Sequence, residues 1–302
     1  MLPLECVPNV SEGRRPEVVA RLAAAAASPR GVRLLDVSSD PDHNRSVLTL
    51  AGEPEGLQAA LLALYEAALG EIDLTRHAGV HPRVGAVDVV PFVPLGDAPM
   101  ELAVAAAESL APEVARRFGL PVYLYEQAAR RPERRTLADI RRGGFEGLPA
   151  RMTDPAWAPD HGPACPHPTA GATVIGARFF LVAFNAVLET ADVAVARSVA
   201  RKVRESGGGL PAVRAMGVYL ASRGRAQVSM NLVDYRRTSV WTALERVRRE
   251  AAALGTRVLE SEVIGLVPEE AALGVVQEAL QLPGFTARGV LESRLRTSTS
   301  EP

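Results

Sequence analysis

Hydrophobic runs of two lengths alternate along the first 125 residues of the chain. Short apolar runs bounded by turn residues predict strands at 2–7, 32–37, 46–51, 87–93 and 122–125. Longer runs with helical spacing predict helices at 16–28, 54–69 and 100–118. Pro16 and Pro54 open the first two helices, where proline is tolerated because the first N–H groups of a helix have no partner within it.

The second half of the chain repeats this order. It predicts a strand at 179–184, a helix at 191–205, a hairpin of strands at 213–220 and 227–234, a helix at 239–254 and a strand at 257–263. Both halves therefore read β-α-β-β-α-β, which is the order of the ferredoxin-like (split βαβ) unit. We expect an α+β protein with two such units, each an antiparallel sheet with helices on one face.

The two halves are joined by a long segment, 128–176, that is rich in Pro, Gly, Arg and His. Loops of this length are usually functional or disordered. Its apolar residues Phe145, Leu148 and Trp157 favour an ordered segment that lies across a surface. The polar tail at 296–302 predicts disorder.

Composition and charge narrow the protein class. The chain has 302 residues with 34 Lys and Arg against 35 Asp and Glu, so its net charge gives no argument for binding nucleic acid or a membrane. The two cysteines, Cys6 and Cys165, form neither a disulfide framework nor a metal-binding spacing. Neither a signal peptide nor an apolar run of membrane-spanning length is present. We therefore expect a cytoplasmic protein.

A loop with two histidines holds the strongest candidate chemistry. His77 and His81 lie four residues apart beside Arg83, just before the predicted strand 87–93. A His-x-x-x-His pair binds zinc well on a helix, but Gly79 and Pro82 interrupt helical structure here, which disfavours a metal site. Histidine can act as acid and base near neutral pH. The residues alone leave two alternatives open, an acid/base site or loop histidines bonded to the backbone.

Six arginines are concentrated between residues 130 and 142. Such a run is commonly a solvated face, but it could also receive a small molecule with several carboxylates. The sequence leaves both alternatives open for Arg130, Arg131, Arg134, Arg135, Arg141 and Arg142.

Two long motifs resemble the glutamate formimidoyltransferase family. They are Glu5-Cys-Val-Pro-Asn-Val-Ser-Glu-Gly13 and His81-Pro-Arg-Val-Gly-Ala-Val-Asp-Val-Val-Pro-Phe-Val-Pro94. Shorter matching blocks extend the resemblance over about residues 1–290, at 35–37, 44–45, 121–125, 134–137, 157–163, 171–178, 183–185, 227–235 and 265–268.

The resemblance implies an activity and an architecture. The family transfers a formimidoyl group from N-formimidoyl-L-glutamate to N5 of tetrahydrofolate, the co-substrate, in histidine degradation and one-carbon metabolism. No metal is expected to take part. The implied architecture is a homodimer whose subunits have an N-terminal subdomain, 1–178, and a C-terminal subdomain, 179–295. Both subdomains would be ferredoxin-like with sheets that face each other, and the fused cyclodeaminase domain of the animal enzymes would be lacking.

The resemblance also implies functional residues. His81 corresponds to the catalytic histidine, a general acid and base. Because both substrates are acidic, Arg83 and Arg178 become candidates for binding their carboxylates. The implied folate-binding residues are Gly162, Pro163, Ala164, Cys165, Pro166, His167, Pro168, Thr169, Ala170 and Gly171.

Two alternative functions stay open at this stage. Val80 and Phe179 stand where the animal enzymes tend to carry an acidic residue and a lysine, and the middle of the folate segment differs. One alternative is formyl transfer from 5-formyltetrahydrofolate to glutamate. The other is a folate-binding module without catalysis.

Overall fold

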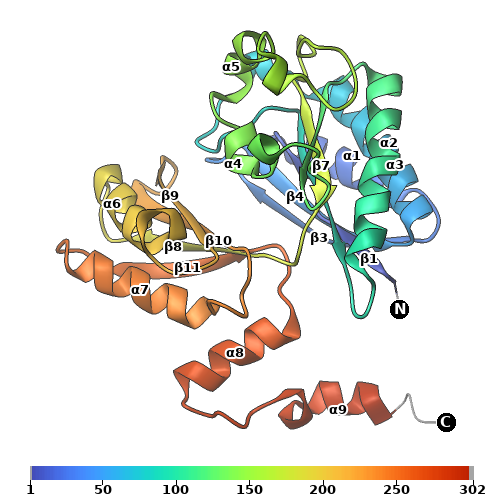
Figure 1. Cartoon of the computed structure of the whole chain (residues 1–302). Coiled ribbons are helices and arrows are strands. Elements are labelled where there is room, and N and C mark those ends of the chain that lie inside the picture. The colour runs from blue at the N-terminus through green and yellow to red at the C-terminus, as the bar shows by residue number, and fades with distance from the viewer. Residues whose placement is uncertain (1, 299–302) are drawn as a thin grey trace. The chain divides into compact units, whose positions relative to one another are not determined.

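The computed structural model describes residues 2–298, excluding the side chains of 295–298, and divides into two compact units on either side of the Phe179–Phe180 bond (Figure 1). Each unit has its own β-sheet, its own helices and its own hydrophobic core. The mixed helix-and-sheet composition that the sequence predicts is confirmed.

The first unit is built on a seven-stranded sheet. Its spatial order is β3, β4, then β1 and β2, which follow each other along the same position between β4 and β5, and then β5, β7 and β6. The pairings of β7 with β5 and β6 are parallel and the others are antiparallel. The strands are β1 (Leu4–Cys6), β2 (Asn9–Val10), β3 (Val32–Asp40), β4 (Arg45–Gly52), β5 (Val87–Pro94), β6 (Val122–Glu126) and β7 (Thr173–Ala177).

The expectation of a purely antiparallel sheet is wrong for this unit. Strand β7 comes from the segment 128–176 and inserts between β5 and β6, with Val174 beside Val89 and Tyr123. All five of its residues are buried, so it lacks the alternation of polar and apolar residues that marks a half-exposed strand.

Helices cover both faces of β5, β7 and β6, so the expectation of helices on one face is also wrong. Figure 1 shows α2 and α3 on one side of the sheet and α4 and α5 on the other. Val90 and Phe92 pack in the core with α1–α3, whereas Val89 packs on the opposite side with Ile140 and Leu148. The helices are α1 (Pro16–Ala27), α2 (Pro54–Glu71), α3 (Met100–Phe118), α4 (Leu137–Ile140) and α5 (Gly144–Arg151), with 3₁₀ turns η1 (Leu74–Arg76), η2 (Pro132–Arg134) and η3 (Pro155–Trp157).

The second unit has a four-stranded antiparallel sheet in the order β11, β8, β10, β9. Val199 of α6 and Val247 of α7 pack in one core with Met230 of β10. The elements are β8 (Val182–Leu188), α6 (Val193–Val203), η4 (Glu205–Gly207), β9 (Val213–Leu220), β10 (Arg225–Leu232), α7 (Val240–Ala252) and β11 (Val258–Ile264).

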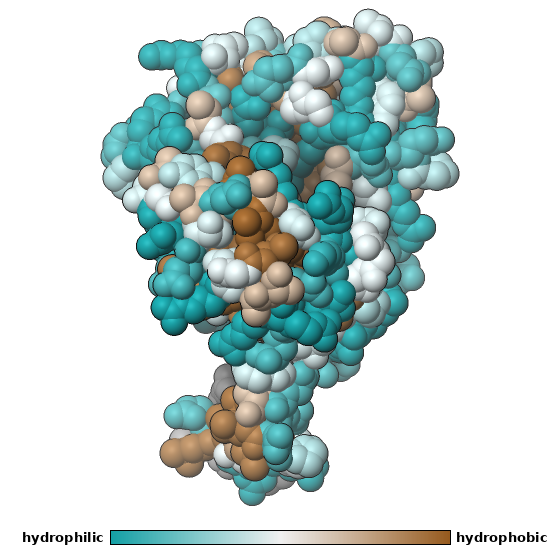
Figure 2. Space-filling view, turned by 90° about the vertical axis from the view of Figure 1, so that its left-hand side faces the viewer, coloured by the Kyte–Doolittle hydropathy of each residue, from teal (hydrophilic) through white to brown (hydrophobic). Residues whose placement is uncertain are grey.

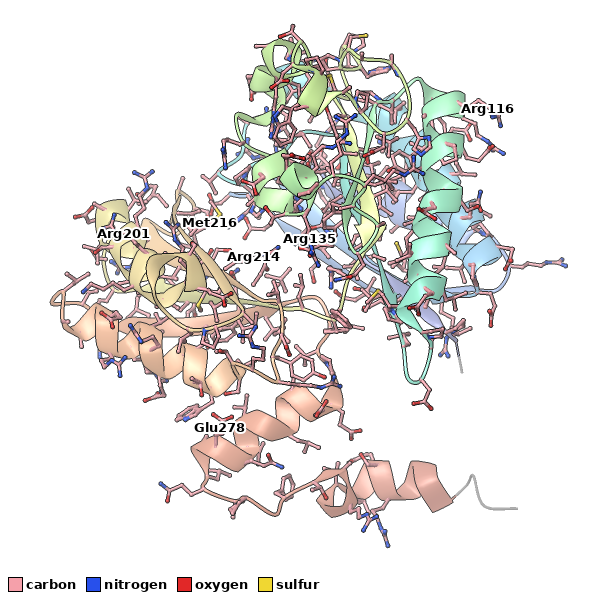
Figure 3. The ribbon with its side chains drawn as sticks, viewed as in Figure 1. Arg116, Arg135, Arg201, Arg214, Met216 and Glu278 are labelled. Carbon is pink, nitrogen blue, oxygen red and sulfur yellow. The ribbon has the colours of Figure 1, made fainter. Side chains whose placement is uncertain are left out.

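Two helices that the sequence did not predict follow this sheet, α8 (Glu269–Ala279) and α9 (Leu291–Ser298), with η5 (Ala287–Gly289) between them. Glu278 of α8 lies next to α7, where it accepts hydrogen bonds from Ser239 and Thr242 (Figure 3). Figure 2 shows hydrophobic side chains on the surface at the level of α8 and α9, and Leu280 and Leu291 are exposed. Helix α9 overlaps the tail expected to be disordered, 296–302, whose last four residues lie outside the described part.

Between residues 2 and 298 no helix combines the length and the apolar character needed to cross a membrane.

Candidate active site

Three loops of the first unit pack against one another around His81: 11–13, 40–45 and 77–86. Two glycines allow this close approach. A Cβ on Gly13 would lie 2.3 Å from the carbonyl oxygen of Asp40, and a Cβ on Gly79 would lie 2.3 Å from that of His43. Any other residue at these positions would push the loops apart, so Gly79, which disfavours a helix in the sequence, and Gly13 both permit backbone contact.

Asn44 connects the three loops. Its backbone has φ +47°, its side-chain oxygen accepts a hydrogen bond from Gly13 N, and its amide nitrogen donates to Ala78 O. Its carbonyl oxygen lies 2.9 Å from Nε2 of His77, while Nε of Arg83 donates to His77 Nδ1 at 3.0 Å. Because a guanidinium can only donate, His77 carries its proton on Nε2. His77 therefore holds the loop and is not free to exchange protons.

Arg83 is engaged within the chain. Its two terminal nitrogens donate to both oxygens of Glu146, at 3.0 and 2.8 Å. This fork is the geometry in which arginine binds a substrate carboxylate. The structure thus places Arg83 beside His77 with its guanidinium occupied, and a substrate carboxylate would have to displace the exposed Glu146.

His81 lies half-buried between an imidazole and a guanidinium. Its Nδ1 is 3.3 Å from Nδ1 of His43, and its Nε2 is 3.4 Å from a terminal nitrogen of Arg141. Since Arg141 can only donate, Nε2 of the neutral ring is the acceptor and Nδ1 carries the proton. Burial, and then the positive charges of Arg45 and Arg141, hold the pKa of His81 well below its ordinary value of 6.5. His81 is therefore neutral at pH 7, with its lone pair on Nε2.

A buried carboxylate supports these two guanidiniums. One oxygen of Asp88 accepts hydrogen bonds from Arg45, at 2.8 Å, and from Arg141, and the other accepts from Val84 N and Gly85 N. Burial raises the pKa of Asp88, but the two arginines outweigh burial and the pKa lies below its ordinary value. Burial and the neighbouring Arg141 lower the pKa of Arg45 to about 10. The resulting Arg–Asp–Arg group leaves a net positive charge beside His81.

The sequence did not single out Arg45, and it named Arg141 only within the basic run. The structure places the arginines of that run in different environments. Arg134 is buried and bonded to Asp160 at 2.8 Å, and Arg141 reaches the His81 site. The remaining four are exposed: Arg130, Arg131, Arg135 and Arg142. The position of Arg45 beside Asn44, within a block that carries the family resemblance, was the available signal.

Comparisons with known proteins identify the family. Residues 3–178 match the model of the formiminotransferase domain, N-terminal subdomain, and residues 183–280 match that of the formiminotransferase domain. The chain belongs to the formiminotransferase family. The resemblance predicted from the sequence is confirmed.

Named relatives of this formiminotransferase span nearly its whole length. A protein of Streptococcus pyogenes serotype M1 named glutamate formimidoyltransferase is 45% identical, over 97% of this chain and 98% of its own length. A protein of Thermoplasma acidophilum with the same name is 43% identical, over 98% of each chain. The formimidoyltransferase-cyclodeaminase of Sus scrofa is 43% identical over 89% of this chain, and the match spans 51% of that longer protein.

The segment 162–171, which the resemblance assigns to folate, ends next to the histidine loop of this formiminotransferase. Gly162 and Gly171 adopt positive φ, +87° and +71°. His167 and Gly171 exchange two backbone hydrogen bonds that close the segment into a turn. Gly171 also pairs with Gly85, and Ala172 N donates to Val84 O, three residues after His81. The end of the proposed folate segment is thereby fixed to the end of the proposed catalytic loop.

Arg178, the other predicted carboxylate ligand, lies elsewhere on the sheet. It follows β7, its backbone N–H donates to Phe92 O, and its side chain donates to Phe179 O. Burial raises the pKa of Glu5 to about 7 and that of Tyr125 to about 12, and the charge of Arg178 opposes both shifts. The structure therefore does not bring Arg178 to Arg83.

Within residues 2–298 no group of three His, Cys, Asp or Glu side chains is arranged to hold a metal ion.

Proposed function

We propose that this formiminotransferase moves the formimidoyl group from N-formimidoyl-L-glutamate to N5 of tetrahydrofolate, with His81 as the general acid and base. The observation that supports the activity best is the full-length similarity to proteins named glutamate formimidoyltransferase. The position of His81 on the loop that leads into β5, with an unprotonated Nε2, supports its role.

The reaction requires one proton to move between two nitrogens. N5 of tetrahydrofolate attacks the formimidoyl carbon, which forms the N5–C bond and gives a tetrahedral intermediate with three nitrogens on one carbon. His81 takes the proton from N5 through Nε2 and delivers it to the glutamate nitrogen. The C–N bond to glutamate then breaks with its electron pair on that nitrogen. One well-placed histidine contributes roughly 10²–10⁴-fold to such a reaction.

The Arg–Asp–Arg group suits this proton transfer. Together with burial, its net positive charge keeps His81 neutral before the reaction and makes the protonated ring a stronger acid afterwards. N5 is strongly acidic once it has attacked, so a weak base is sufficient. The stronger acid then favours departure of glutamate. The same positive charge attracts the carboxylates of both substrates.

We propose the family architecture for the whole chain. The strand orders support two ferredoxin-like subdomains, 1–178 and 179–295, since β11-β8-β10-β9 places the four strands as 4-1-3-2. In the first unit β5, then β1 with β2, then β4 and β3 repeat that order when β1 and β2 are counted together as the first strand. We further propose that the sheets of the two subdomains face each other, that residues 162–171 bind folate, and that the protein is a cytoplasmic homodimer. Sedimentation of the purified protein tests the dimer.

The activity is tested by mixing purified protein with tetrahydrofolate and N-formimidoyl-L-glutamate and following the folate absorbance. Formation of 5-formimidoyl-tetrahydrofolate is the expected result, and no turnover would refute the proposal. A parallel reaction with 5-formyltetrahydrofolate and glutamate separates the formyl-transfer alternative, which predicts faster turnover of the formyl donor. Folate binding without either reaction would favour the non-catalytic module.

The pH dependence should reflect the low pKa of His81. A general base must be unprotonated, so activity falls only as the pH drops through the pKa of His81, which lies well below 6.5. We expect kcat/KM for N-formimidoyl-L-glutamate, at saturating tetrahydrofolate, to stay level from pH 8 to about 6.5. A decline that begins above pH 6.5 would contradict the assigned role.

A further inference from the structure

Glu5 is a buried carboxyl group that the proposed mechanism does not use. It lies on β1, on the face of the sheet opposite to Leu4 and Cys6, which pack in the core with α1–α3. The residue is 5% exposed, and its Oε2 has no hydrogen-bond partner within the described chain. A buried polar atom without a partner is costly and calls for an explanation.

Glu5 shares a face of the sheet with the His81 site. It pairs with Val93 of β5, while Arg178 lies beyond the end of β7 and acts on Glu5 through its charge. The ring of Tyr125 lies over Gly176, where an added Cβ would be 2.5 Å from Cδ1 of the ring. The charges of both Arg178 and Arg141 act on Tyr125. A row of buried polar groups on this face of the sheet therefore runs from Glu5, by way of Tyr125, to the arginine that contacts His81.

Glu5 and the His81 site are too far apart for one small group to touch both. Glu5 is four residues before Asn9, about 13 Å along an extended strand. Asn9 accepts a hydrogen bond from Arg45, at the His81 end. A ligand that reaches Glu5 must therefore extend well beyond its reacting atom.

We propose, on the basis of the proposed function, that Glu5 binds the 2-amino-4-oxopyrimidine edge of the tetrahydrofolate pteridine ring. That edge presents N3–H and an amino N–H side by side, so that both can donate to one carboxylate, as the fork of an arginine does. It lies at the opposite end of the fused ring from N5, which would face His81. The amidine of the donor is also a planar N–C–N fork, but its carbon reacts at His81 and cannot be held at the far end.

The titration of Glu5 agrees with this assignment. Burial raises the pKa of Glu5 to about 7, against the opposing charge of Arg178. Two N–H donors favour the ionised carboxylate, so binding of the ring should lower the pKa and release a proton.

The first test is Glu5→Gln. The amide can accept only one of the two hydrogen bonds, so KM for tetrahydrofolate should rise about 10–100-fold. KM for N-formimidoyl-L-glutamate should stay within about twofold, because the donor does not reach Glu5. Glu101→Gln, on the exposed first turn of α3, is the matched control and should change neither constant.

A modified ligand tests the same contact from the other side. The tetrahydro form of 2-desamino-2-methylfolate lacks the amino donor, and its affinity for the unaltered protein should fall about as far as that of the Gln variant for tetrahydrofolate. The Gln variant should bind both ligands about equally, because each change removes the same contact. Calorimetry of tetrahydrofolate binding at pH 7 in two buffers should show release of about half a proton, which the variant abolishes.

The outcomes separate this proposal from the proposed function. No turnover by the unaltered protein refutes the activity, whereas normal turnover with an unchanged KM for tetrahydrofolate in Glu5→Gln refutes the Glu5 contact. A rise in KM for the donor alone assigns the carboxyl to the amidine and also overturns it. Burial raises the pKa of Glu5 to about 7, so at pH 8 its ionised carboxylate destabilises the folded protein. The Gln variant lacks this charge and should unfold at the same or a higher temperature than the unaltered protein. If the variant fails to fold, equal binding of both folates by the unaltered protein refutes the contact.

Discussion

His81→Ala should lower kcat by about 10²–10⁴-fold while the affinity for tetrahydrofolate stays within about threefold. The substitution removes an imidazole whose Nε2 is unprotonated and is held only by a long contact, 3.4 Å, to Arg141. An incoming substrate N–H can displace that contact. Single-turnover absorbance measurements give the rate, and calorimetry with tetrahydrofolate gives the affinity.

A supporting histidine serves as the comparison for this variant. His43→Ala removes the ring beside Nδ1 of His81 but leaves Nε2 in place, so we expect a smaller loss of kcat. Added imidazole should partly restore the rate of His81→Ala, because the half-buried His81 leaves a space that solvent can reach, and should not restore that of His43→Ala. Undiminished turnover by His81→Ala would show that another group moves the proton. Loss of folate affinity in parallel with kcat would point to a collapsed loop.

Most elements of the fold were predictable because local signals determine them. Pro16 and Pro54 mark helix starts, and the bounds of α3 match the predicted helix. Strand β7 was not predictable in this way. It is five buried residues long, includes Gly176, and follows a segment rich in Pro and Gly, so neither its length nor its periodicity distinguishes it from a loop. It becomes a strand because β5 and β6 supply parallel partners on both sides.

Only the part of the candidate site that lies within one stretch of sequence, the histidine loop, was predictable. His81 stood out through its loop, but the groups that set its pKa come from β4 and from the segment just after α4, and no spacing in the sequence connects residues 45, 88 and 141. Arg83 shows the opposite case. It lies two residues from His81, yet its guanidinium bonds to Glu146 and His77, whereas Arg141 contacts His81 from 60 residues away. Proximity in sequence therefore does not identify the guanidinium that contacts His81.

Asp88→Asn should destabilise the protein by about 3–5 kcal/mol and abolish most activity. Asp88 is fully buried and is the carboxylate between Arg45 and Arg141. Without its charge, two buried guanidiniums repel each other with no anion between them, and Arg141 no longer has a fixed position beside His81. Urea denaturation monitored by circular dichroism measures the stability.

Glu113→Gln is the matched control for this prediction. Glu113 also accepts hydrogen bonds from two arginines, Arg116 and Arg117, but on the outer surface of α3, where Arg116 points away from the sheet (Figure 3). Water solvates these charges, so the urea midpoint should hardly change.

The pH dependence of the difference in stability between Asp88→Asn and the unaltered protein tests the cause of the destabilisation. The pKa of Asp88 in the folded protein lies below the ordinary value of 3.8, so its charge stabilises the fold above that pH. This stabilisation is lost as the pH falls through the pKa of Asp88 in the folded protein. Below that pH the carboxyl group of Asp88 is neutral, like the amide that replaces it in the variant. The difference in stability should therefore be full at pH 7 and shrink below about pH 3.8. A difference that stays constant down to pH 3 would mean that the hydrogen bonds to Val84 and Gly85, rather than the charge between the arginines, account for the loss.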